Sequence, residues 1–391
     1  MSKKVLGIVA EYNPFHNGHK YHIDEAMKLV EPDVVVCAMS GNFVQRGEPA
    51  IFNKFSRATT AINNGLDIVI EIPTYFATST AENFAYSAIS ILKNAGITHL
   101  AFGVESENIE LLSKIADFLI EEPEEYKIEL KKQLDTGISF ANARDIAVSK
   151  FINNDLLKLP NNILAIEYLK AIKYFNAEIV PVPIKRTVGY YDFYVKNHIT
   201  SATNIRALLS TNNCASVYKL IPENSRIPDK NVFFEDFNDI FMYKLKTTNI
   251  DRLKSIPDVI EGLENRIISS LYTTNDINEI IDTIKTKRYT LSRIKRIMIS
   301  LLLDINSTDL EIFKKNGYTE YLRILAMSQK GKKYLSEINK ISEIPAITSV
   351  KKFLDIANES QKKMLEKDIL ASNIYSLISK DEYNIDFTNR I

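Results

Sequence analysis

Two histidines near the N-terminus, His16 and His19, combine a residue type and a spacing that suit phosphate chemistry. They follow an apolar run from Val5 to Ala10 that predicts a buried strand, and apolar residues at helical spacing come after them. We therefore expect both side chains in or just before the first turn of a helix, on one face. Unpaired N–H groups at a helix start attract phosphate, and imidazoles can donate hydrogen bonds to phosphate oxygens in a transition state. The sequence predicts a nucleotide site at this strand–loop–helix corner.

A zinc site is the alternative interpretation of the same stretch, because three of the five histidines, His16, His19 and His22, fall within it. No cysteine lies close to them in the sequence, and zinc needs further ligands. We therefore favour the nucleotide site, assign no metal ligands and expect His22 to be structural.

The composition is that of an ordinary globular protein. A chain of 391 residues favours two domains, and contents of 45% hydrophobic and 25% charged residues are typical of soluble proteins. The formal net charge of +0 gives no overall attraction to nucleic acid, so a nucleic-acid partner would need a local cluster of cations. Cys37 and Cys214 form no spaced motif, and no apolar run is long enough to span a bilayer. A reduced, cytoplasmic protein is expected.

Short apolar runs alternate with helical patterns in the first half of the chain. This alternation predicts a parallel sheet with helices on both faces, and ligands bind beyond the carboxyl ends of such strands. The loops that follow the strands are therefore the places where functional side chains are expected. The predicted strands after the first one are Asp33–Met39, Ile68–Ile72, His99–Gly103 and Glu178–Val182, the last of the sheet.

The pattern changes near residue 213, from which point we expect only helices. We therefore predict an α/β domain over residues 1–212 and an all-α domain over residues 213–391. The predicted helices are Asp236–Lys246, Glu261–Tyr272, Leu291–Leu303, Tyr321–Met327 and Lys362–Lys380. Local cations in this half suit an RNA backbone, with Tyr289 and Tyr334 available to stack on bases. A solvated helix face is the alternative interpretation of the same cations. The cations that we select are Arg293, Lys295 and Arg296, which lie in a different predicted domain from the histidines.

Several motifs together carry a resemblance to a known family. His16-Asn17-Gly18-His19 is similar to the HxGH signature of the nucleotidyltransferase superfamily. The wider stretch Glu11–His19 resembles the opening of the tRNA(Met) cytidine acetate ligases. The likeness continues in Met39–Ala50, Pro160–Leu164, Ile184–Arg186, Ser201–Arg206 and Tyr289–Arg296, so it covers nearly the whole chain.

The resemblance implies a Rossmann-like nucleotidyltransferase domain that binds ATP, with His16 and His19 as catalytic residues. Magnesium on the phosphates is expected, although no carboxylate pair marks a site for it. Ala202 departs from the serine-rich second signature of the superfamily, so one hydroxyl contact is missing there. Asn161 is taken as the nucleotide contact, with Asn162 as the fallback. The ATP-binding residues implied by the family are Gly7, Ile8, Val9, Ala10, Glu11, Tyr12, Asn13, Pro14, Phe15, His16, Asn17, Gly18, His19, Lys20, Gly103, Asn161, Arg186, Ser201 and Arg206.

The activity that the resemblance implies is a two-step ligation. ATP and acetate would give acetyl-adenylate and pyrophosphate, and the wobble cytidine of elongator tRNA(Met) would then take the acetyl group on N4. A small-molecule adenylyltransferase is the alternative function, since it would share HxGH and the second signature without needing a basic helical domain. A nucleic-acid-binding protein with an inactive nucleotide fold is a third possibility, which the intact pairing of His16 and His19 with Arg186 disfavours.

Overall fold

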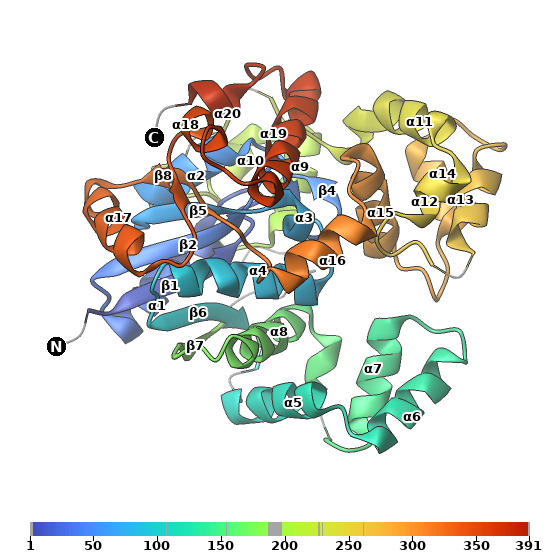
Figure 1. Cartoon of the computed structure of the whole chain (residues 1–391), viewed down its shortest axis with the longest axis horizontal. Helices are drawn as coiled ribbons and strands as arrows, with labels where there is room; N and C mark the ends of the chain where they lie inside the picture. Colours follow the sequence, from blue (N-terminus) through green and yellow to red (C-terminus); the bar gives the residue numbers. More distant parts are fainter. Residues whose placement is uncertain are drawn as a thin grey trace.

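A seven-stranded sheet in the order β7-β6-β1-β2-β5-β8-β9 forms the centre of the protein (Figure 1). The structure is a computed structural model that describes residues 3–106, 108–153, 155–186, 198–225, 227–228, 230–260 and 262–389. Strand β8 is antiparallel to β5, and the other neighbouring strands are parallel. The mixed α/β fold with a mainly parallel sheet is confirmed. The strands are β1 (Val5–Ala10), β2 (Val34–Ser40), β5 (Ile68–Ile72), β6 (His99–Val104), β7 (Val180–Lys185), β8 (Leu322–Met327) and β9 (Ala346–Ile347).

Alternating side chains of β1 and β2 supply both faces of the sheet, as the period of two in a strand requires. Leu6 and Val35 pack with helices α1 (Asn17–Val30) and α2 (Lys54–Asn63). Val5, Val34, Val36 and Ala38 belong to the larger core, which includes helices α4 (Ala81–Asn94) and α8 (Pro160–Tyr174). Strands buried on both faces read as continuous apolar runs, which is why the sequence pattern located them.

The C-terminal half contributes strands that the sequence did not predict. The segment Tyr321–Met327 was expected to be a helix, but β8 occupies it and pairs with β5. The prediction of this helix is wrong, and so is the expectation of only helices after residue 213. Because β8 and β9 both join the sheet, β7 is not its last strand. A short apolar run has no periodicity that distinguishes a buried strand from a buried helix. The segment is a strand because β5 is available to pair with it. The division into domains at residue 212 stays a prediction.

Four buried charges fasten the C-terminal half to the sheet. Lys54 Nζ lies 2.8 Å from Glu71 Oε1 and 2.9 Å from Asp386 Oδ1. Arg323 Nη2 in turn donates to Asp386 Oδ1 over 2.7 Å. These residues come from α2, β5, β8 and α20 (Ile385–Thr388), so the network joins segments that are far apart in the chain. Removing one partner of such a buried pair leaves an uncompensated charge, which typically costs about 3–5 kcal/mol.

The remaining helices surround this sheet in groups. In Figure 1, the helices of residues 109–149 project on one side and those of residues 238–302 on another, whereas those of residues 329–388 lie beside the sheet. Glu261, the first residue of one predicted helix, lies outside the described residues. A two-stranded hairpin, β3 (Phe43–Val44) with β4 (Glu48–Pro49), follows β2. The other helices are α3 (Thr74–Ala77), α5 (Ile109–Glu121), α6 (Glu124–Leu134), α7 (Phe140–Ser149), η1 (Leu156–Lys158), α9 (Ala202–Ser210), α10 (Cys214–Val217), η2 (Phe234–Phe237), α11 (Asn238–Thr247), α12 (Ile250–Lys254), α13 (Leu263–Ser270), α14 (Ile277–Ile284), α15 (Leu291–Leu302), α16 (Ser307–Lys315), α17 (Gln329–Ile341), α18 (Val350–Leu354) and α19 (Glu359–Ser379).

Candidate active site

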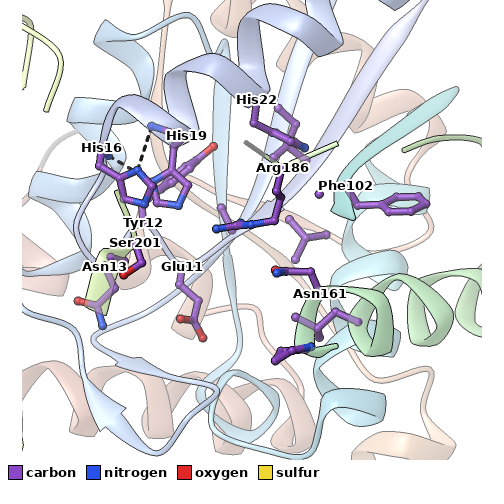
Figure 2. Close-up of a pocket in the computed structure, with 18 of the residues that line it drawn as sticks. Glu11, Tyr12, Asn13, His16, His19, His22, Phe102, Asn161, Arg186 and Ser201 are labelled. Atoms are coloured by element: carbon purple, nitrogen blue, oxygen red, sulfur yellow. Dashed lines mark hydrogen bonds between the residues drawn. The ribbon is translucent and has the colours of Figure 1, made fainter. Parts of the chain in front are cut away.

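A cavity of about 200 Å³ opens at the carboxyl ends of β1, β6 and β7. Figure 2 shows His16, His19 and Ser201 on one side of it, Arg186 and Asn161 on the other, and Glu11 between the two groups. The structure thus brings together side chains from β6, α8, α9 and the β1–α1 loop at the edge where a parallel sheet binds ligands. The predicted residues that line the cavity are Ile8, Val9, Ala10, Glu11, Tyr12, Asn13, His16, Gly18, His19, Gly103, Asn161, Arg186, Ser201 and Arg206.

Five residues of the predicted ATP-binding set do not line this cavity: Gly7, Pro14, Phe15, Asn17 and Lys20. A Cβ at Gly7 would lie 2.4 Å from Ile97 Cδ1, so this glycine lets Ile97, between α4 and β6, pack against β1. Phe15 is buried in the core, and Lys20 pairs with Asp24. Asn17 Nδ2 donates to the carbonyl oxygens of residues 198 and 219, at 3.0 and 3.3 Å. In this structure these side chains support the corner rather than face the cavity.

The two histidines cap the helix that they begin. His16 is the N-cap of α1, and its Nδ1 accepts a hydrogen bond from the N–H of Gly18 at 3.0 Å. His19 Nδ1 accepts from the N–H of His16 at 3.2 Å, which completes a capping box. The two rings are stacked, with centroids 3.8 Å apart. Because each Nδ1 is an acceptor, a neutral imidazole carries its proton on Nε2, which is then the donor available to a ligand.

Electrostatics keep both rings neutral near pH 7. Burial, with the nearby cations Arg186 and Arg206 adding to it, lowers the pKa of His16 to about 3. Burial also holds the pKa of His19 well below its usual value, with His16 and Arg186 adding to the effect. The site therefore offers two neutral N–H donors in the place where a triphosphate would meet the start of α1. Such donors can stabilise negative charge that develops on a phosphate without giving up a proton.

Helix α9 supplies a second set of polar groups across the cavity. Ser201 is its N-cap, with Oγ accepting from the N–H of Asn204 at 3.2 Å. Arg206 Nη1 donates to the carbonyl oxygen of Asn13 at 2.8 Å, and Nη2 donates to Thr203 Oγ1 at 3.3 Å. Arg206 therefore ties α9 to the loop that carries His16 while its guanidinium remains part of the cavity wall.

The opposite wall holds the end of β6 and the start of α8. The stem of Arg186 lies over Gly103, where a Cβ would stand 3.4 Å from Arg186 Cγ. Asn161 lines the cavity, and its Nδ2 contacts Glu105 Oε1. Asn162 is fully buried, and its Oδ1 accepts from the N–H of Glu105 at 3.0 Å. Of the two asparagines, the structure therefore places Asn161 at the cavity and Asn162 in a backbone-supporting role.

Sequence reasoning missed two parts of this site. Phe84, Phe102 and Tyr168 form an aromatic part of the wall, but their spacing indicated only core positions within their helices and strand. Arg57 is buried beneath the loops, where its guanidinium donates to backbone carbonyl oxygens of Glu11, Ser40, Gly41 and Phe52. Arg57 lies on the buried face of α2, and a cation among buried positions was the signal that could have located it.

The three cations selected for RNA binding are held by contacts within the protein. Arg293 Nη2 donates to the carbonyl oxygen of Asp258 at 2.7 Å, and Arg296 Nη2 lies 3.3 Å from Asp258 Oδ2. Lys295 Nζ lies 2.7 Å from Glu48 Oε1, in the hairpin beside the cavity. Lys295 therefore reaches a residue beside the cavity from the predicted helical half, and its assignment to RNA stays a prediction.

The two tyrosines proposed to stack on bases are also buried. Tyr334 is 4% exposed, and its hydroxyl donates to the carbonyl oxygen of Ala95 at 3.0 Å. Tyr289 is 7% exposed, with the guanidinium of Arg293 5.1 Å from its ring centroid. Neither ring offers an open face in this structure, so the expectation of stacking is wrong for both.

No three histidine, cysteine, aspartate or glutamate side chains among the described residues are grouped closely enough to hold a metal ion. No helix in the same part of the chain combines the length and the apolarity that a membrane crossing requires.

The fold and the cavity are those of a nucleotidyltransferase. The model of the family described as HIGH Nucleotidyl Transferase matches residues 3–389. The chain is 44% identical over 391 residues to the tRNA(Met) cytidine acetate ligase of Thermoanaerobacter sp. (strain X514), which covers 96% of both proteins. It is 40% identical to the protein of the same name from Clostridium kluyveri (strain NBRC 12016), over 98% of this chain and 97% of that protein. This chain belongs to the tRNA(Met) cytidine acetate ligase family.

Solved structures agree with this assignment. The crystal structure of Thermotoga maritima TmcAL bound with α-thio ATP is similar with a TM-score of 0.92 and 34% sequence identity, over 99% of this chain and 98% of that one. The apo form of the same protein gives a TM-score of 0.93 and covers the same fractions of the two chains. The likeness to the family stated from the motifs is confirmed over nearly the full length.

Proposed function

We propose that this protein activates acetate with ATP and transfers the acetyl group to N4 of the wobble cytidine of elongator tRNA(Met). The observation that carries the proposal is the pair of neutral, stacked imidazoles at the start of α1, facing one cavity with Arg186 and Arg206. In the first step an acetate oxygen attacks the α-phosphorus of ATP and pyrophosphate leaves. In the second step the cytidine N4 attacks the acetyl carbon, AMP leaves, and the amine loses one proton.

The chain's own groups account for what the first step requires. Transfer at a phosphate needs alignment of the reactants and stabilisation of charge more than covalent help from the protein. Nε2–H donors on His16 and His19 stabilise charge that develops on the α-phosphate and the leaving pyrophosphate. Arg186 and Arg206 bind the phosphates from opposite walls, and the N-terminus of α9 at Ser201 adds backbone donors.

Magnesium fits this proposal only as an ion carried by the nucleotide. Glu11 is the one carboxylate side chain among the described residues that line the cavity. Burial raises its pKa, and Arg46 partly opposes that rise, so Glu11 already has a cationic neighbour. One such carboxylate does not make a magnesium site, because protein-held magnesium usually takes several oxygen ligands. The phosphates of ATP would have to supply most of them, and with magnesium bound they would carry less net charge.

We place the tRNA against the helices that include α15. Arg293, Lys295 and Arg296 are half-buried there, and Lys285 and Lys287 are exposed in the turn before α15. A local cluster of cations can bind RNA phosphates although the whole chain has no net charge, because phosphate contacts depend on local charge. ATP and tRNA as substrates imply a cytoplasmic location.

Acetate-dependent chemistry tests the proposal. The protein is incubated with ATP and magnesium, with and without acetate, and pyrophosphate release is measured. A second reaction adds tRNA(Met), whose nucleosides are then analysed by mass spectrometry for N4-acetylcytidine. Acetate-dependent pyrophosphate release with acetylation of one cytidine is the expected result. Release that requires a phosphorylated cofactor precursor instead of acetate would identify the small-molecule adenylyltransferase and refute the proposal.

A further inference from the structure

The β3–β4 hairpin lies between the cavity and helix α15. On the cavity side, Gln45 and Arg46 line the wall, and the N–H of Gln45 donates to Glu11 Oε1 at 3.0 Å. On the other side the hairpin touches the backbone of α15, since a Cβ at Gly47 would lie 2.3 Å from the Arg296 nitrogen. Gly47 also has a φ of +76°, which a residue with a side chain rarely adopts. The hairpin therefore connects α15 directly to the nucleotide site.

Glu48 at the end of this hairpin is shared between cations of the two sides. Its Oε1 lies 2.7 Å from Lys295 Nζ on α15, and its Oε2 lies 4.0 Å from Arg206 Nη2 in the cavity wall. Burial alone would raise the pKa of Glu48, but Lys295, Arg206 and Arg46 outweigh this effect and lower it. Glu48 is therefore an ionised carboxylate beside two arginines that line the cavity.

We propose that Lys295 is a positioning residue of the nucleotide site, which neutralises Glu48 and so leaves Arg206 and Arg46 to the phosphates of ATP. The proposal rests on the ATP site proposed above and adds a role to a residue of the helical half. The lysine is well placed for it, because its side chain is 14% exposed and its Nζ also lies 4.7 Å from the ring centroid of Phe234. Both contacts hold the ammonium beside Glu48 rather than in solvent.

This arrangement predicts whether each substitution weakens or restores the binding of ATP. Without the ammonium of Lys295, Glu48 keeps Arg206 and Arg46 as cationic neighbours and draws them away from an anionic ligand. If a phosphate lies about 10 Å from the carboxylate of Glu48, one uncompensated charge changes binding by about tenfold at an effective dielectric constant near 20. Removing the carboxylate of Glu48 as well takes away the group that competes with the phosphates for the arginines. The double variant should therefore recover the affinity for ATP.

Calorimetric titration with α,β-methylene ATP tests the proposal without acetate or tRNA, so it stands apart from the test of the ligase reaction. Lys295→Met keeps an apolar stem against Phe234 and should weaken binding by about tenfold. Lys295→Arg should bind like the wild type, and Glu48→Gln should bind at least as tightly. Glu48→Gln combined with Lys295→Met should return to within about threefold of the wild type.

A second ion pair of the helical half provides the matched control. Lys244 Nζ lies 2.6 Å from Asp304 Oδ2, and neither residue lines the cavity. Lys244→Met should therefore leave the affinity for the analogue unchanged. Wild-type affinity in Lys295→Met would overturn the proposal. A double variant as weak as Lys295→Met would also overturn it, because the loss would then come from disturbed packing and not from Glu48.

Discussion

Replacing His16 by asparagine separates two roles that the structure assigns to one side chain. His16 Nδ1 caps α1 by accepting from the N–H of Gly18 at 3.0 Å, which leaves Nε2–H for the ligand. Asparagine is among the best N-cap residues, so His16→Asn should keep the cap and lose the donor. His16→Ala should lose both, and the missing cap alone costs about 0.5–2 kcal/mol of stability.

The size of the catalytic effect follows from the proposed role of the donor. Removing one donor that acts on developing charge costs about 2.7–4 kcal/mol, or about 100- to 1000-fold in kcat. We expect both variants to lose kcat for acetate-dependent pyrophosphate release to this extent, with KM for ATP changed by less than about threefold. His16→Ala should in addition melt at a lower temperature than His16→Asn. A raised KM with kcat intact in either variant would refute the assignment.

The protonation state of His16 adds a check that uses the same assay. Burial lowers its pKa to about 3, so the ring stays neutral throughout the range from pH 8 to pH 5. The kcat of the wild type should therefore show no ionisation near 6.5 that disappears in His16→Asn. A titration near 6.5 that the substitution abolishes would mean that His16 acts as an acid or base rather than as a neutral donor.

Three further predictions concern the cations and the acid stability of the protein. Arg186→Ala should weaken binding of a non-hydrolysable ATP analogue, and Arg186→Lys should restore it poorly because a lysine is a point charge and not a planar fork; unchanged calorimetric affinity in the alanine variant would remove Arg186 from the site. Replacing Arg293 and Arg296 by alanine should lower tRNA affinity and flatten its salt dependence by roughly 0.7 to 0.9 of a unit per lost contact, measured by filter binding across a salt series; an unchanged slope would refute the RNA contact. Because burial lowers the pKa of His16 to about 3 and that of His22 to about 4, the unfolded chain binds more protons below about pH 6.5. As the pH is lowered from about 6 to about 4, the free energy of unfolding should decrease by up to about 1.4 kcal/mol per pH unit for each histidine. Denaturant titrations of His22→Asn should show a smaller decrease than those of the wild type.

Local patterns in the sequence located the elements that carry the chemistry. The apolar run of β1 followed by His16-Asn17-Gly18-His19 predicted a strand–loop–helix corner, and the structure has β1 and α1 there. The segment Ser201–Arg206, which resembles the second signature of the superfamily, contains a helix start, with Ser201 as the N-cap of α9. These predictions succeed because the signals for a helix cap and for a strand buried on both faces lie in consecutive residues.

Tertiary structure alone decided which distant residues share the site. The aromatic wall at Phe84 and Tyr168 and the buried Arg57 come from helices whose own periodicity indicates only a core face. The segment β8 is a strand because β5 is available beside it, not because of its own composition.

Lys295 shows most clearly that contacts between distant segments are not visible in the sequence. It joins Glu48 across a sequence separation of 247 residues, and this contact places a residue of the helical half beside the nucleotide cavity. Spacing along the sequence carries no information about such a pair, because the contact exists only once the hairpin and α15 have packed together. The sequence by itself therefore determined the local geometry of the phosphate corner, whereas the charge balance around it was decided by packing between segments remote in the chain.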